Sequence, residues 1–209
     1  MNLFHSMPQG LLVLFVIPLI VAVILVLAAG RRDDDPAGTR TQMRYVGAIG
    51  IVTLFVALLS FFGVVRALTS LVVDGSSTND VYRRSLNQGL LMLAALAVFV
   101  FHYRRATALA PAKGFARGGT GSAARAGLYG VCFVAAVIAL VAAAKGLYGI
   151  FQLIAPGVFG VNGVPRFVDL DSDTVRQTGI ANFLSFGSLS AASVLIFLRA
   201  WNWLPEHRS

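Results

Sequence analysis

The sequence predicts an all-α, polytopic membrane protein with five transmembrane helices. Apolar residues make up 57% of the 209 residues and charged residues only 12%, about half the roughly 25% of a typical soluble domain. The apolar residues gather in runs of about 20 or more, the length of helix that crosses a hydrocarbon core of about 30 Å. Helices are expected because lipid offers no hydrogen-bond partner to an open backbone. The hydrophobicity excludes intrinsic disorder, and the single cysteine excludes a disulfide scaffold.

The predicted spans are separated by more polar connections. They run from Gly10 to Gly30, from Tyr45 to about Val73, from about Leu86 to Tyr103, from about Ala126 to Ala155, and from about Gly179 to Trp201. Pro18 is expected to kink the first span. No Lys or Arg precedes this span, and Arg31 and Arg32 follow it, so we interpret it as an uncleaved anchor rather than a signal peptide.

Basic residues favour one side of the predicted membrane. The loops after the first and third spans, together with the C-terminal tail, contain Arg31, Arg32, Arg40, Arg44, Arg104, Arg105, Lys113, Arg117, Arg125, Arg199 and Arg208. By the positive-inside rule, this predicts a cell (plasma or inner) membrane protein with its N-terminus outside and its C-terminus in the cytoplasm. The net charge of +8 is interpreted as anchoring of the spans, so no nucleic-acid partner is expected.

The last four spans are predicted to be two copies of one helix pair. A shift of about 83 residues aligns Gly47 with Gly130 and Gly63 with Gly146, and a shift of about 94 aligns the third span with the fifth. Both copies run outward and back, so they are parallel repeats. We expect a four-helix bundle with the first span at its periphery. The predicted parts are the anchor and its loop (1–42), the first pair (43–106), a cytoplasmic linker (107–125), and the second pair with the tail (126–209).

A basic-aromatic pattern marks the first helix pair. Arg44-Tyr45 opens the second span, and Phe101-His102-Tyr103-Arg104-Arg105 closes the third. With these features, the region from about Met43 to Trp201 resembles an uncharacterised prokaryotic membrane-domain family of unknown function, whose paired helices often end in a His-aromatic-basic cluster. The second copy departs from this pattern, with Ile196-Phe197-Leu198-Arg199 where the histidine would fall. The resemblance implies a prokaryotic multi-pass protein and no particular activity.

Two basic residues, Arg66 and Lys145, lie late in predicted spans. Lys145 falls about 28 Å beyond Ala126 along a helix, near the outer interface, where a long basic side chain can reach the headgroups. No Asp or Glu lies within a span to pair with either base. We interpret both as interface or partner contacts, and an ion or substrate role is the alternative. Interface or partner contacts are also expected from His102, Tyr103, Trp201 and Trp203.

The fifth span is rich in small and hydroxyl residues. Ser185, Gly187, Ser188 and Ala191 predict close helix packing, because small residues let backbones approach and hydroxyls can bond across helices. The alternative is that Ser185, Ser188 and Asn182 line a polar pore.

No catalytic, cofactor or metal site is predicted. Asp169, Asp171 and Asp173 alternate, but a calcium loop of the EF-hand type would need Gly and Glu where Thr174 and Ile180 stand. Capping of a helix that begins near Thr174 is the better interpretation of Asp173. We therefore expect a non-enzymatic accessory subunit, in contact with lipid and other subunits of a larger, for example energy-transducing, membrane assembly. The alternatives are a small oligomeric transporter or channel and, less favoured, a membrane enzyme or sensor.

Overall fold

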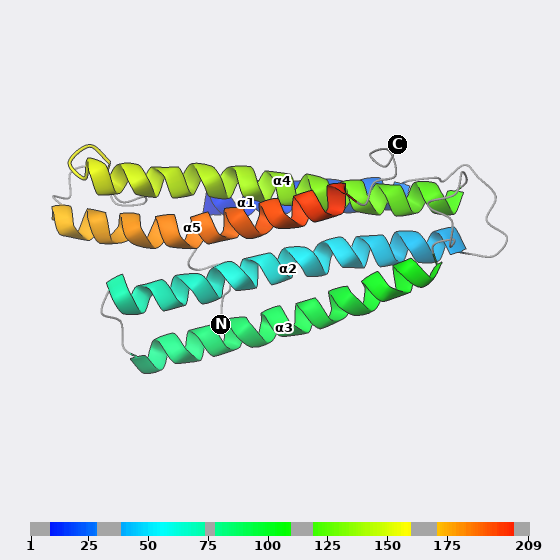
Figure 1. Cartoon of the computed structure of the whole chain (residues 1–209), viewed down its shortest axis with the longest axis horizontal. Coiled ribbons are helices and arrows are strands. Elements are labelled where there is room, and N and C mark those ends of the chain that lie inside the picture. The colour runs from blue at the N-terminus through cyan, green and yellow to red at the C-terminus, as the bar shows by residue number, and fades with distance from the viewer. Residues whose placement is uncertain (1–8, 29–38, 74–77, 110–118, 160–170, 203–209) are drawn as a thin grey trace.

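The computed structural model describes residues 9–28, 39–73, 78–109, 119–159 and 171–202, and these ranges form an all-α structure (Figure 1). The helices are α1 (Gln9–Ala28), α2 (Thr39–Val73), α3 (Thr78–Leu109), α4 (Gly119–Ile154) and α5 (Ser172–Trp201). The prediction of an all-α fold is confirmed. Four helices are long and apolar enough to cross a membrane, with spans Thr41–Leu71, Thr78–Arg105, Ala123–Ile154 and Ser172–Trp201. The chain is therefore a membrane protein by the length and composition of these helices.

The helices are longer than the apolar runs that predict them. α2 has 35 residues and α4 has 36, so each is about 52–54 Å long and exceeds the roughly 30 Å hydrocarbon core. α3 and α5 begin several residues before the predicted spans, with Asp80 and Asp173 in their first turns, where a carboxylate favours the helix dipole. Asp173 is not the cap that the sequence suggested. Asp171 occupies the N-cap position of α5 without a side-chain capping bond.

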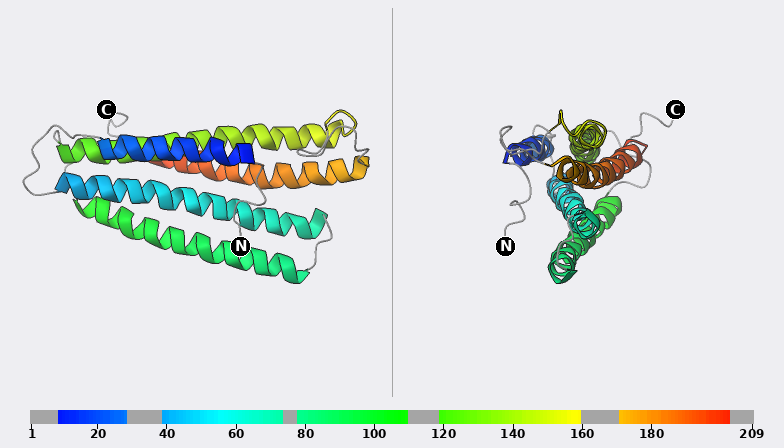
Figure 2. Two further views of the ribbon diagram at one scale, coloured as in Figure 1. Left: turned by 180° about the vertical axis from the view of Figure 1, so that it is seen from behind. Right: turned by 90° about the vertical axis from the view of Figure 1, so that its left-hand side faces the viewer.

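The two helical hairpins, α2–α3 and α4–α5, pack on each other mainly through α2. α2 contacts both α4 and α5, whereas α3 contacts chiefly α2 among the described residues. The end-on view in Figure 2 shows α3 on the far side of α2 from α4 and α5. Only 6% of the apolar window of α3 is buried inside the chain, against 44% for α4.

The predicted four-helix bundle with a peripheral first helix is not confirmed. α1 packs against α4 and α2, and its Phe15, Ala22 and Val26 belong to the hydrophobic core. The least covered helix is α3 instead. Sequence periodicity gave no direction for α1, because this helix is apolar over its whole circumference.

Glycines set the closest helix contacts. A Cβ atom on Gly47 of α2 would lie 3.5 Å from the Cα of Gly127 in α4. A Cβ atom on Gly149 of α4 would lie 2.7 Å from the carbonyl oxygen of Gly179 in α5. The distance at Gly149 leaves no room for a side chain, whereas the distance at Gly47 is an ordinary van der Waals contact. Glycines at these positions allow the backbones to approach as small residues do in membrane helices generally.

The glycines that the predicted repeat aligns have different neighbours in the two hairpins. Gly63 of α2 faces the side chain of Gln88 in α3, whereas Gly146 of α4 faces the backbone of Gly187 in α5. The shift that defines the repeat pairs Gln88 with Asn182, which lies five residues, or about 1.4 helical turns, from Gly187. The repeat is therefore not confirmed, although both pairs share the same order of helices.

Candidate functional site

The candidate site is a network of polar side chains that joins α2, α5 and α4 within their apolar windows. Nη1 of Arg66 donates a hydrogen bond to Oδ1 of Asn182 over 3.2 Å. Nδ2 of Asn182 then donates to Oε1 of Gln152 over 3.0 Å. Asn182 thus connects one side chain from each of the other two helices, using its carbonyl toward α2 and its amide toward α4. We call Arg66, Asn182 and Gln152, with Thr69 and Ser185, the polar network.

Two hydroxyl residues extend the polar network by one turn. Oγ1 of Thr69 lies 3.4 Å from Oγ of Ser185 and also donates to the carbonyl oxygen of Arg66 over 2.9 Å. Ser185 and Gln152 are fully buried. A buried amide or hydroxyl costs free energy unless it is hydrogen-bonded, so these contacts favour one relative placement of α2, α4 and α5.

The network places a cation at the edge of the expected hydrocarbon core. Arg66 follows Arg44 by 22 positions in α2, which is about 33 Å along a helix. One hydrogen bond of Arg66 goes to a neutral amide, that of Asn182.

Three further polar atoms of α2 and α3 are buried. Oγ of Ser60, Oγ of Ser85 and Oε1 of Gln88 have no hydrogen-bond partner among the described residues. The side chain of Gln88 lies against Gly63, one turn before Arg66. The contact between α2 and α3 is therefore polar but incompletely satisfied, unlike the contacts of α5 with α2 and α4.

Lys145 lies apart from these hydrogen bonds, on an aromatic cluster near the end of α4. Its Nζ is 6.0 Å from the ring centroid of Tyr148, at the outer limit of a cation–π contact. Phe159 packs edge-on against Tyr148 and stacks on Phe151. The predicted interface contact of Lys145 remains a prediction.

The predicted aromatic interface residues lie at the opposite end of the helices from the polar network. The His102 ring packs against Tyr45 and Phe101, and its Nδ1 lies 2.8 Å from the carbonyl oxygen of Val98. Tyr103 stacks on Phe99, and Trp201 stacks on Phe197 and remains 37% exposed. Trp203 lies outside the described residues.

The small residues predicted in α5 have different surroundings. Ser185 joins the polar network, and Gly187 lies beside Gly146. Ser188 donates to the carbonyl oxygen of Ser185 in its own helix, and Ala191 is exposed.

Sequence reasoning missed Gln152 and Thr69, and it considered Asn182 only as a pore residue. An amide in an otherwise apolar run is the signal that marks Gln152, because such a group requires a partner inside the membrane.

The described residues offer no group of three or more His, Cys, Asp or Glu side chains able to hold a metal ion. The polar network contains neither a carboxylate nor an imidazole, so its chemistry is hydrogen bonding and charge rather than proton transfer. Comparison of the chain with protein-family models, with curated proteins and with solved structures found no match, so the suggested resemblance to a prokaryotic membrane-domain family gains no support from them.

Proposed function

We propose that the protein is a non-enzymatic accessory subunit that packs through α3 within a larger membrane assembly. The observation that carries the proposal is the exposure of α3, whose apolar window is only 6% buried inside the chain. Its outward side combines large side chains, such as Leu90 and Phe101, with the exposed Ala94 and Ala97 between them. Small residues flanked by large ones suit the close approach of another helix.

The polar network supports this proposal, because its polar side chains form hydrogen bonds with one another inside the chain. Hydrogen bonds from α5 to α2 and α4 give those three helices a fixed arrangement. α3 is held to this unit only along α2 among the described residues. The unit then presents α3 to a neighbouring membrane subunit while lipid covers the remaining faces.

The proposed setting is a prokaryotic cell membrane, with the C-terminus in the cytoplasm. The orientation is supported by the end of the helices that carries Arg44, Arg104, Arg105, Arg125 and Arg199, which we call the arginine-rich end. The described acidic residues lie in or just before the first turns of α3 and α5, at the opposite end. The positive-inside rule assigns the arginine-rich end to the cytoplasm.

Purification from native membranes in a mild detergent tests the proposal. The double variant A94L/A97L enlarges the exposed side of α3, and A136L/A144L makes the same change at exposed alanines of α4. We expect the unaltered protein and the α4 variant to co-purify with the same partner in stoichiometric amounts, as measured by mass spectrometry, and the α3 variant to lose it. Recovery of all three proteins as monomers or homo-oligomers would contradict the proposal.

The second candidate is a small oligomeric transporter or channel. The observation that favours it is the polar network itself, since ionisable residues within membrane helices often mark ion or substrate paths. In proteoliposomes, a transport role predicts flux that Asn182→Leu abolishes and that Ser188→Leu also lowers if Ser188 lines the path. Liposomes without flux would count against this candidate.

A further inference from the structure

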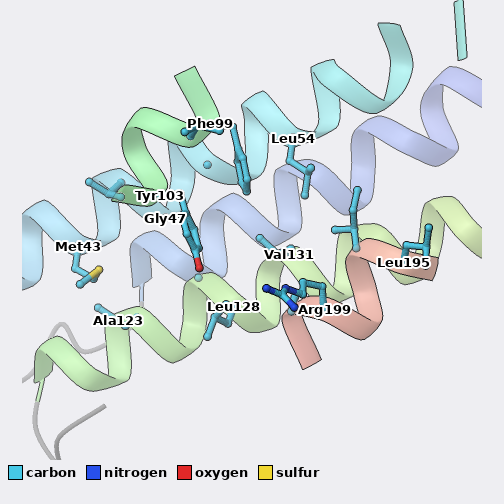
Figure 3. Close-up of a pocket in the computed structure, with 17 residues that line it drawn as sticks. Met43, Gly47, Leu54, Phe99, Tyr103, Ala123, Leu128, Val131, Leu195 and Arg199 are labelled. Carbon is cyan, nitrogen blue, oxygen red and sulfur yellow. The ribbon is translucent and has the colours of Figure 1, made fainter. Parts of the chain in front are cut away.

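An apolar groove opens between α2, α3, α4 and α5 at the arginine-rich end (Figure 3). Its volume is about 600 Å³, within the roughly 300–1,000 Å³ of sites that hold small molecules. Gly50 and Leu54 of α2, Val131 of α4 and Leu195 of α5 contribute to its walls. No atom lies within 4 Å of the position that a Cβ on Gly50 would take, so this glycine borders open space.

Two polar side chains, Tyr103 and Arg199, line the groove among otherwise apolar residues and glycines. Figure 3 shows the Tyr103 hydroxyl and the Arg199 guanidinium reaching in from α3 and α5, respectively. Arg199 precedes the end of α5 by two residues, whereas Leu54 lies ten residues beyond Arg44 in α2, about 15 Å deeper along the helix. The groove therefore runs from a charged mouth toward the apolar middle of the helices.

The mouth lies at a basic end of the described helices. Arg44, Arg104, Arg105 and Arg125 lie near the same end of the helices, and no Asp or Glu occurs there within the described ranges. Nε and Nη2 of Arg44 are buried and have no hydrogen-bond partner among those residues. Such a site favours an anion attached to an apolar tail.

We propose that the groove binds one anionic phospholipid, with an acyl chain between the four helices and the phosphate at Arg199. A guanidinium pairs with phosphate through charge-assisted hydrogen bonds, and basic pockets between transmembrane helices on the cytoplasmic side suit anionic headgroups. A lipid of the cytoplasmic leaflet would place its phosphate at the charged mouth of the groove and its hydrocarbon tail along the apolar interior. This inference does not depend on the proposed partner subunit.

The test is lipid binding by the purified, delipidated full chain, followed by native mass spectrometry with phosphatidylglycerol or phosphatidylcholine added. We expect one phosphatidylglycerol per chain to bind preferentially. Gly50→Leu fills the groove and should weaken binding by about tenfold or more. Gly89→Leu is the matched control, because a Cβ on Gly89 also meets nothing within 4 Å and Gly89 does not line the groove.

Charge variants separate the headgroup contact from the tail contact. Arg199→Gln should reduce the preference for phosphatidylglycerol over phosphatidylcholine, whereas Arg176→Gln, at the other end of α5, should leave it unchanged. Circular dichroism and size-exclusion chromatography confirm that each variant is folded. Equal binding by Gly50→Leu and Gly89→Leu, equal binding of the two lipids by the unaltered protein, or occupation of the groove by a second copy of the chain would overturn the proposal.

Discussion

Replacing Asn182 with leucine removes both hydrogen bonds through which α5 connects Arg66 of α2 to Gln152 of α4. Leucine has the same branched arrangement of side-chain heavy atoms as asparagine, so the change replaces the polar groups of the amide with two larger methyl groups. Gln152 is fully buried and would lose its hydrogen bond to α5. Arg66 would lose the acceptor that lies 3.2 Å from its Nη1.

The magnitude follows from the two bonds. An interhelical hydrogen bond in a membrane protein contributes about 0.6 kcal/mol on average and up to about 1.7 kcal/mol, and a bond to a charged group contributes more than a neutral one. We expect Asn182→Leu to lower the free energy of unfolding by about 2 kcal/mol. Ser188→Ala is the control in the same helix, because Ser188 bonds only to the backbone of α5, and its effect should remain below about 0.5 kcal/mol.

Reversible unfolding in mixed micelles of SDS and a mild detergent, followed by circular dichroism, measures these free energies. A double-mutant cycle with Gln152→Leu isolates the contact between the two amides, and its coupling energy should be about 1 kcal/mol. An effect of Asn182→Leu no larger than that of Ser188→Ala, or a coupling energy of zero, would refute the assignment of the polar network as the connection between α2, α5 and α4.

Three other predictions follow from single positions. Gly149→Ala should lower the free energy of unfolding by about 2 kcal/mol or more, because the added Cβ would lie 2.7 Å from the backbone oxygen of Gly179. Gly89→Ala, at a position with open space around it, should raise the free energy of unfolding by up to about 1 kcal/mol. The same SDS titration measures both. The one cysteine of the chain is buried in α4, so it should react with a maleimide only after SDS is added, and fast labelling in mild detergent would contradict that packing. In a variant that lacks this cysteine, an impermeant maleimide should label Ser172→Cys on intact cells and should label Arg105→Cys only after lysis. The reverse pattern would show that the orientation is opposite to the one proposed.

Hydropathy predicted the helices because it depends on residues that are close in sequence. It could not predict the partner of Arg66, because Asn182 lies 116 positions away and becomes a neighbour only once α2 packs on α5. The sequence alone suggested that Arg66 extends toward the headgroups, since no carboxylate was available. The amide of Asn182 offers an oxygen acceptor within the chain instead.

The contacts of the small residues in α5 could not be predicted from the sequence either. Gly187 and Ala191 are four positions apart, a spacing that predicts one packing face, yet Ala191 is exposed. Among the described glycines of α4 and α5, the closest contacts across the two helices are at Gly149 and Gly179. Spacing identifies residues on one side of a helix and does not say which side faces a neighbour. That choice depends on the crossing of the helices, which is a property of the whole set of contacts.

Close packing at one face and the groove at the next have a common origin in the glycines of α2. Gly47 lets α2 approach Gly127 of α4, whereas Gly50, one turn further, borders open space. Closing that space would require α3 or α5 to move toward α4, but hydrogen bonds hold α5 to α2 near the opposite end, at Asn182 and Ser185. Apolar walls that face a void lose dispersion contacts. A flexible hydrocarbon chain from the surrounding lipid can supply those contacts without rearranging the helices, and the charge of Arg199 at the mouth gives that chain a preferred headgroup.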